Sequence, residues 1–142
     1  MNKILIIGGA GFIGHNLAIK LKNKSNKVDI VDSLQINNLY TLDKRNDLPF
    51  PKLTRAIINN RLEILKKNKL NIYKIDSRNY QELKNHIITY DPDVIIHLAA
   101  VSHANKSNLQ PYQSFDNSLL TLENSLDISR DLKNLKRFIY FS

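Results

Sequence analysis

Residues 3–14 read KILIIGGAGFIG, a short apolar run that leads directly into three spaced glycines. In such a loop, Gly8 allows a sharp turn, Gly11 allows the backbone to approach a phosphate, and Gly14 allows close packing of the helix that follows. The N-terminus of that helix directs free N–H groups and the positive end of its dipole towards the same point. The stretch therefore predicts a strand, a phosphate-binding loop and a helix, in that order.

The sequence after the loop fits this interpretation. Ile13, Leu17 and Leu21 recur every fourth residue, which predicts one apolar face of a helix. A second β-branched run, 28–31, ends in Asp32, and an acidic residue about 20 positions past the glycines completes the fingerprint of a dinucleotide site. Its carboxylate would accept hydrogen bonds from the ribose hydroxyls of adenosine.

The residue after Asp32 bears on which dinucleotide binds. Ser33 stands where an arginine would accommodate a 2′-phosphate, so the sequence favours NAD over NADP. On the glycine stretch alone one alternative stays open, because flavodoxin-like folds contain the same strand, turn and helix without binding a dinucleotide.

Length and composition indicate one globular domain. The chain has 142 residues, of which 42% are hydrophobic. It contains no apolar stretch long enough to cross a membrane and no apolar signal segment, so we expect a cytoplasmic protein without a membrane partner. The absence of cysteine excludes disulfides, thiolate nucleophiles and cysteine-based zinc sites, and no metal site is predicted.

The formal net charge of +8 raises the question of nucleic-acid binding. The lysines are spread over predicted helix ends and connections, without interleaved aromatic side chains or a recognition-helix motif. Basic residues near helix C-termini also complement the helix dipole. We therefore expect a solvated basic surface and no nucleic-acid partner.

Periodicity divides the rest of the chain into alternating helices and strands. After residue 32 we expect a polar connection (33–52), a helix (53–67), a strand (71–75), a helix marked by Tyr80, Leu83 and Ile87, a strand (94–98), a helix (111–132) and a strand (137–141). Inward-facing side chains are predicted at Leu53, Ala56, Ile57, Ile64 and Leu65 of the first long helix and at Leu119, Leu122 and Leu126 of the last.

This alternation predicts an α/β fold, a doubly wound parallel sheet of five strands in the order 3-2-1-4-5. A single domain would span residues 1–142, ending at strand 5. The nucleotide would lie across the carboxyl ends of the strands, at the switch between strands 1 and 4.

Five motifs in this order resemble the NAD-dependent epimerase/dehydratase family, extended short-chain dehydrogenases/reductases of the UDP-glucose 4-epimerase type that act on nucleotide sugars. They are the loop 8–14, Asp32, Asp76, the run 97–100 and the run 138–142. The resemblance covers essentially the whole chain. It implies a Rossmann fold, NAD as cofactor and, for the full-length family, a nucleotide-sugar substrate.

The resemblance also implies roles for individual residues. Phe12 and Ile13 would contact the pyrophosphate through their backbone, and Asp76 with Ser77 would meet the adenine. Residues 98–102 would lie along the nicotinamide-side ribose, where small side chains leave room for the ring. The cofactor-binding residues implied in this way are Gly8, Gly11, Phe12, Ile13, Gly14, Asp32, Ser33, Asp76, Ser77, Leu98, Ala99, Ala100, Val101, Ser102 and Asn117.

Several of these positions, and some nearby, keep a structural alternative. Asp76 could instead, or in addition, cap the helix that follows it, and Asn117 could be an ordinary surface asparagine. His97 lies inside an apolar strand and fits a core histidine with satisfied hydrogen bonds better than a base or a metal ligand. His103 and Lys106 occupy the region where the family places substrate-facing residues, with a solvated loop as the alternative.

No catalytic residue is predicted in this chain. Hydride transfer in the family depends on a Tyr-x-x-x-Lys pair that opens a helix after strand 5. The spacings Tyr40/Lys44 and Tyr80/Lys84 both precede strand 4, so neither fits that position. The chain therefore resembles the cofactor-binding portion of an epimerase or dehydratase, cut near Ser142 before its catalytic segment.

Three functions stay open at this point. The first is an NAD-dependent nucleotide-sugar epimerase or dehydratase, represented by a fragment or an early-terminating product that is inactive alone. The second is a non-catalytic module that binds NAD or senses its redox state. The third is an interaction protein, because strand 5 would form a sheet edge exposing Phe138 and Tyr140 and would associate with itself or a partner.

Overall fold

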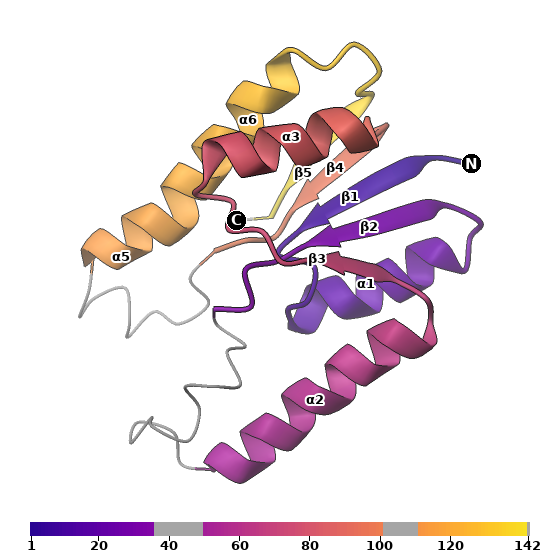
Figure 1. Ribbon diagram of the computed structural model, residues 1–142, viewed down its shortest axis with the longest axis vertical. Helices are drawn as coiled ribbons and strands as arrows, with labels where there is room; N and C mark the ends of the chain where they lie inside the picture. The colour runs from indigo at the N-terminus through magenta and orange to yellow at the C-terminus, as the bar shows by residue number, and fades with distance from the viewer. Residues whose placement is uncertain (36–49, 101–110, 142) are drawn as a thin grey trace.

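The computed structural model describes residues 1–35, 50–100 and 111–141. Strands and helices alternate along it, as Figure 1 shows. In chain order the elements are β1 (Lys3–Ile7), α1 (Phe12–Lys22), β2 (Lys27–Val31), α2 (Pro51–Lys67), β3 (Asn71–Tyr73), α3 (Tyr80–Tyr90), β4 (Val94–His97), α5 (Pro111–Phe115), the π-helical turn η2 (Asp116–Leu120), α6 (Thr121–Arg130) and β5 (Arg137–Tyr140).

The described strands form one parallel sheet in the order β3-β2-β1-β4-β5. The predicted α/β class, parallel pairing and strand order are thus confirmed. The chain moves outward from β1 to β3 and then returns to place β4 on the other side of β1. Loops that leave β1 and β4 therefore diverge at their carboxyl ends, and this divergence opens a crevice in sheets of this type.

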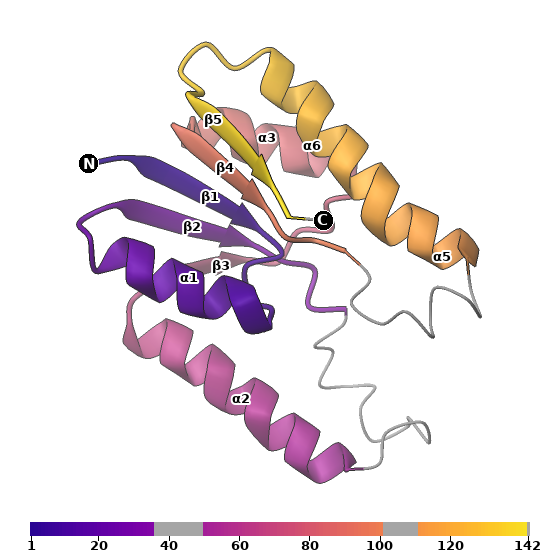
Figure 2. The same ribbon diagram turned by 180° about the vertical axis from the view of Figure 1, so that it is seen from behind.

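The central strand β1 supplies side chains to two separate cores. Ile4 and Ile6 belong to a cluster with residues of α1 and α2, whereas Leu5 and Ile7 belong to a cluster with residues of α3 and α6. Successive side chains of a strand point to opposite faces, so an unbroken apolar run is what a strand covered on both faces requires. Figure 2 shows the result from behind: α1 and α2 on one face, α3 and α6 on the other.

Helix α2 buries only part of the face that was predicted to point inward. Its buried side chains are Ile58 and Leu65, while Leu53, Ala56 and Ile57 are exposed. Figure 1 shows the first turns of α2 extending beyond the strands, so apolar side chains there have no sheet to pack against. The apolar spacing thus predicted the helix correctly and its inward face only in the C-terminal half, where Leu65 is buried and Ile64 is half-buried.

The helix predicted over 111–132 is present as α5, η2 and α6, with the π turn in the middle. Its inward face is not the predicted one. Leu119 and Leu126 are exposed and Leu122 is half-buried. The buried residues of α6 are Thr121, Asn124, Ser125 and Ile128. A largely polar stripe thus faces inward.

Two smaller differences concern element ends and the first helix. Strand β3 ends at Tyr73, because the amide of Ile75 donates to the Tyr73 carbonyl at 2.9 Å and turns the chain. Ile13 was predicted on the inward face of α1, but its side chain is exposed. Gly14 and Ala18 are the buried residues of that helix.

His97 is fully buried in β4, beside the rings of Phe138 and Tyr140. The prediction of a core histidine is confirmed, but the prediction that its hydrogen bonds are satisfied was wrong. Within the described residues, neither Nδ1 nor Nε2 has a hydrogen-bond partner. Burial without a partner disfavours the charged ring and lowers the pKa of His97 to about 4.

Replacing His97 with leucine should flatten the pH dependence of stability. In the wild type, the unfolded histidine takes up a proton as the pH falls through its ordinary pKa of 6.5, whereas the folded one stays neutral until about 4. The free energy of unfolding should therefore fall between these pH values by up to about 3 kcal/mol, and His97→Leu should lose that component. Urea unfolding at several pH values measures the free energy of unfolding of both proteins. The same dependence on pH in the wild type and in His97→Leu would contradict the prediction.

Candidate dinucleotide site

A cavity of about 630 Å³ opens at the carboxyl ends of the strands. It is lined by Gly8, Gly11, Phe12, Ile13, Gly14, Val31, Asp32, Ser33, Gln35, Arg61, Asp76, Ser77, Leu98, Ala99, Ala100, Asn117, Thr121 and Phe141. Every predicted cofactor-binding residue within the described part of the chain is among them. Val101 and Ser102, like His103 and Lys106, lie outside the described residues.

The glycines of the loop after β1 have distinct packing environments. Gly8 has φ of +80°, and a Cβ there would lie 2.7 Å from the amide nitrogen of Ala99, so this turn requires glycine. A Cβ on Gly14 would lie 2.6 Å from the Cα of Gly9, which means that the helix packs directly on the loop backbone. Gly11 is less confined, since its Cβ would meet the Gly8 carbonyl oxygen at 3.3 Å.

The first turn of α1 faces the cavity without a side-chain cap. Gly11 is the N-cap residue, no side chain bonds to the first amides, and the first turn contains no acidic residue. Residues 11–14 all line the cavity. Free N–H groups and the positive end of a helix dipole favour an anion such as a diphosphate at this position.

Asp32 follows β2 and bonds to two backbone amides. Its Oδ2 accepts from the Ala10 amide at 2.9 Å and its Oδ1 from the Leu34 amide at 2.8 Å. Burial raises the pKa of Asp32, and these two bonds and the charge of Arg61 oppose that rise. The predicted ribose ligand therefore lies at the cavity and also holds the glycine loop, a task that the sequence did not reveal.

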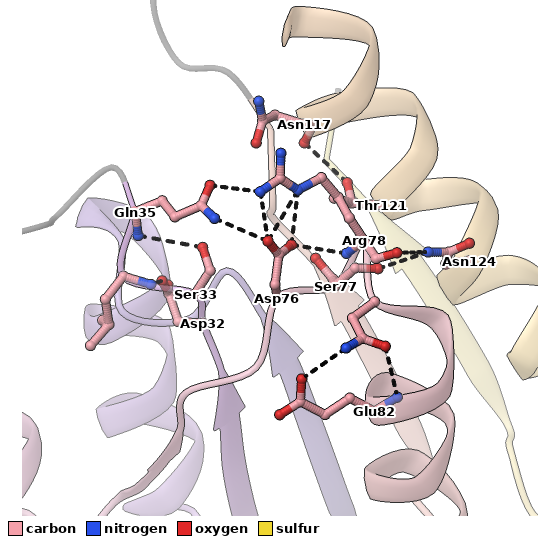
Figure 3. A network of polar contacts seen from close by, with 12 residues as sticks. Asp32, Ser33, Gln35, Asp76, Ser77, Arg78, Glu82, Asn117, Thr121 and Asn124 are labelled. Carbon is pink, nitrogen blue, oxygen red and sulfur yellow. Dashed lines mark hydrogen bonds and ion pairs between the residues drawn. The ribbon is translucent and has the colours of Figure 1, made fainter.

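Asp76 follows β3 and forms a closed network with two other side chains (Figure 3). Arg78 donates to its carboxylate through Nε at 3.0 Å and Nη2 at 2.6 Å, and Gln35 donates through Nε2 at 3.0 Å. Arg78 Nη2 also donates to Gln35 Oε1 at 3.0 Å. The bonds from Arg78 lower the pKa of Asp76, so its carboxylate is an acceptor at neutral pH. The alternative role as helix cap was wrong, because Asn79 Oδ1 accepts from the Glu82 amide at the start of α3.

Asn124 of helix α6 binds the backbone of the same loop, while the other polar side chains of the inward stripe bond within their own helix. Asn124 Nδ2 donates to the carbonyl oxygens of Ser77 and Arg78, both at 3.0 Å. Thr121 Oγ1 donates to the carbonyl oxygen of Asn117 at 3.1 Å, across the π turn that contains Asn117. Such π turns within α-helices are frequent at functional sites. Asn117 lines the cavity, as the family resemblance implies.

Sequence reasoning missed five residues of the cavity wall, namely Val31, Gln35, Arg61, Thr121 and Phe141. Gln35 could have been suspected from its position three residues after Asp32. Arg61 gave no such signal, because an arginine within a helix normally extends into solvent.

The Tyr80/Lys84 spacing does not belong to this cavity. Neither residue lines it, and Tyr80 Oη donates to Asp127 Oδ2 at 2.7 Å. That bond raises the pKa of Tyr80, whereas a tyrosinate base requires a lowered one. These contacts agree with the prediction that the pair is not catalytic. Tyr40 and Lys44 lie outside the described residues.

Residues 1–35, 50–100 and 111–141 contain neither a cluster of metal ligands nor a membrane-spanning helix. No group of three or more His, Cys, Asp or Glu side chains there could hold a metal ion. Among the same residues, no helix has the length and apolar character needed to cross a membrane.

Comparison with known proteins identifies the family. The sequence model of the NAD dependent epimerase/dehydratase family matches residues 4–142. The chain belongs to this family. Membership confirms the resemblance stated from the motifs and, at the level of the family, confirms NAD as the cofactor.

Curated relatives of the family are longer than this chain. Protein CapI of Staphylococcus aureus is 32% identical over 140 residues, which cover 99% of this chain and 37% of that protein. The dTDP-D-glucose 4,6-dehydratase of Dictyostelium discoideum is 34% identical over 148 residues, which cover 100% of this chain and 29% of that protein. The chain thus spans well under half the length of these relatives.

Solved structures show the same fold. UDP-glucose 4-epimerase from Bifidobacterium longum, in complex with NAD+ and UDP, matches with a TM-score of 0.74 at 24% identity. The enzyme from Stenotrophomonas maltophila, with bound NAD and formylated UDP-arabinopyranose, matches with a TM-score of 0.74 at 21% identity. Each match covers 99% of this chain and 36% of the other. These likenesses establish the Rossmann-type fold.

Alanine substitutions at two glycines should separate folding from ligand binding. Gly14→Ala should lower the free energy of unfolding by about 1–3 kcal/mol, because its Cβ would overlap the Gly9 backbone. Gly11→Ala is the matched control and should change it by less than about 1 kcal/mol, since an N-cap glycine with φ of −69° tolerates alanine. Its added methyl group should instead weaken NAD binding. Urea unfolding and calorimetry measure the two effects, and equal losses of stability would contradict the assignment.

Proposed function

We propose that this chain is the NAD-binding portion of an enzyme that transfers hydride between NAD and a ring carbon of a nucleotide sugar. The observation that carries the proposal is the convergence of three different groups on one cavity. An uncapped helix N-terminus suits a diphosphate, Asp32 suits a ribose, and the Asp76 network suits an adenine. The groups come from three successive β-α units, and their order along the cavity is that of the parts of a dinucleotide.

At the adenine end, Asp76 would accept a hydrogen bond from the exocyclic amine. Its carboxylate already accepts from Arg78 and Gln35. Arg78 is bound through two side-chain nitrogens, whereas Gln35 contributes one amide bond from the loop after β2. The adenine amine would therefore replace Gln35 Nε2, while Arg78 keeps the carboxylate charged and oriented.

At the other end, the residues after β4 would position the nicotinamide ring. Leu98, Ala99 and Ala100 line the cavity, and the last two have side chains small enough to leave space for a ring and its ribose. When bound, NAD accepts a hydride from the sugar and can return it. The part of the chain described here would orient the ring and shield it from water, with Asn117 on the facing helix.

The second candidate is a non-catalytic module that binds NAD or senses its redox state, or a truncated and inactive gene product. It is favoured by one observation: among the described residues, no Tyr-x-x-x-Lys pair lines the cavity. The nucleotide sequence that follows the Ser142 codon separates the candidates. A Ser and a Tyr-x-x-x-Lys segment in frame would support the enzyme, and an immediate stop codon would favour the module.

We further propose that residues 1–142 act as one domain, that this chain alone is inactive and that the protein works in the cytoplasm. The nucleotide sugar would bind beyond the nicotinamide end of the cavity, on the side lined by Ala99 and Ala100. Which sugar is bound depends on side chains outside the described residues.

The proposed cofactor site is tested by titrating the purified chain with NAD+ in a calorimeter. Asp32→Ala should weaken binding by at least about tenfold, because it removes both the ribose acceptor and the bond that holds the Ala10 amide. Asp131→Ala, at an exposed aspartate outside the cavity, is the matched control and should bind like the wild type. Absence of binding by the wild type would refute the proposal, and unchanged affinity of Asp32→Ala would remove the ribose role.

We also propose that two copies of the chain associate through β5. This strand pairs with β4 on one side, and no other described strand pairs with it. Tyr140 is exposed as predicted (43%), and Ile139 and Phe141 are 39% and 47% exposed. The predicted exposure of Phe138 was wrong, because its ring is half-buried against the core. Unpaired backbone groups beside exposed apolar side chains make such an edge a template for pairing.

Sedimentation velocity over a range of concentrations tests this association. The wild type should show a sedimentation coefficient that increases with concentration. Ile139→Lys should remain monomeric, because a charged side chain on an edge strand opposes pairing. A wild-type monomer at every concentration would refute the association.

A further inference from the structure

Helix α2 contributes an arginine to the wall of the nucleotide cavity. Arg61 Nη1 donates to the carbonyl oxygen of Ala10 at 3.2 Å. The guanidinium is also close enough to Asp32 for electrostatic attraction. Arg61 thus connects a helix that begins far along the chain with the glycine loop and the predicted ribose ligand.

These contacts hold the same residue of the loop from two sides. The Ala10 amide donates to Asp32, and the Ala10 carbonyl accepts from Arg61. Ala10 is 1% exposed, so solvent is a poor substitute for either partner. Gly11, the next residue, is the N-cap of α1. The pair Asp32 and Arg61 therefore fixes the point from which the uncapped amides of α1 face the cavity.

The two side chains have opposite effects on a phosphate. The Asp32 carboxylate suits a ribose with free hydroxyls and repels a 2′-phosphate. A guanidinium has a planar set of donors that matches phosphate geometry. The neighbours of Asp32 in sequence include no such group, in agreement with NAD as the cofactor of the family. Arg61, however, reaches the same wall of the cavity from α2.

We propose that Arg61 positions the glycine loop and, together with Asp32, determines the choice between NAD and NADP. In the wild type, the Asp32 carboxylate excludes the 2′-phosphate and Arg61 donates its hydrogen bond to the Ala10 carbonyl. Once the charge of Asp32 is removed, Arg61 binds the 2′-phosphate. The inference rests on the proposed binding of NAD by this chain.

Calorimetric titration with NAD+ tests the positioning role. Arg61→Leu should bind NAD+ at least about tenfold more weakly than the wild type, because the buried carbonyl loses a charged donor. The NAD+ affinity of Arg61→Lys should lie between those of the wild type and Arg61→Leu, since lysine keeps the positive charge and lacks the planar set of N–H donors. Lys66→Leu, which removes a cation from an exposed position of α2, should bind like the wild type.

Wild-type affinity in Arg61→Leu would overturn the positioning role. A wild type that fails to bind NAD+ would refute the proposed function instead, so the two failures are distinguishable. Circular dichroism establishes whether Arg61→Leu is folded. If Arg61→Leu is unfolded, the NAD+ affinity of Arg61→Lys tests the positioning role, and wild-type affinity in that variant would overturn it.

Titration with NADP+ tests the selectivity role. Asp32→Asn keeps an oxygen that can accept from the Ala10 amide and removes the negative charge. Its ratio of NADP+ to NAD+ affinity should rise at least about tenfold, the scale of one charge-assisted hydrogen bond. The double variant Asp32→Asn/Arg61→Leu should lose that gain. Equal NADP+ affinity in the single and double variants would overturn the role of Arg61 in cofactor choice.

Discussion

The hydrogen bond from the Ala10 amide to the Asp32 carboxylate joins the ends of two neighbouring strands at the point where the cavity begins. Strands β1 and β2 pair as far as Ile7 and Val31, and the Gly8 amide continues the ladder by donating to the Val31 carbonyl at 2.8 Å. Asp32 extends this pairing by one more bond, made by a side chain. The geometry of the loop, the start of α1 and the position of the carboxylate are therefore set together.

This coupling explains why a partly buried carboxylate is retained there. Burial raises the pKa of Asp32, so its charge is unfavourable in itself. Two amide bonds and Arg61 offset that penalty only in part. Since the side chain that holds the loop also lines the cavity, folding of the loop and the proposed recognition of a ribose would depend on one residue.

The sequence was sufficient for the sheet and for most of the cavity wall because both follow from local patterns. Each β-α unit presents its apolar strand, its turn and its polar strand end in order, and parallel pairing brings the strand ends to one edge. Gly8 and Asp32 could therefore be placed at the cavity from their spacing, whereas Asp76 and Ala99 were placed there by the family resemblance. It was harder to predict which face of each helix is buried. Apolar spacing reveals a stripe, but whether the stripe is covered depends on how far the sheet extends and on which loops need hydrogen-bond partners. Asn124 is buried because two carbonyl oxygens after β3 require a donor, whereas Leu126 of that helix is left exposed. Arg61 was missed for the same reason, since its partner Ala10 is remote in sequence.

The two ends of the sheet use their polar groups differently. At the amino end, Asp93 accepts from the Lys3 amide at 2.7 Å and pairs with Lys136 at 2.7 Å, so the starts of β1, β4 and β5 are tied within the chain. At the carboxyl end, the first turn of α1 has no side-chain cap. An N-cap side chain is worth about 1 kcal/mol to a helix, and a bound anion supplies the same hydrogen bonds. Capping of α1 and the proposed binding of a diphosphate would thus be one interaction, and a ligand that supplied it would stabilise the folded chain by mass action.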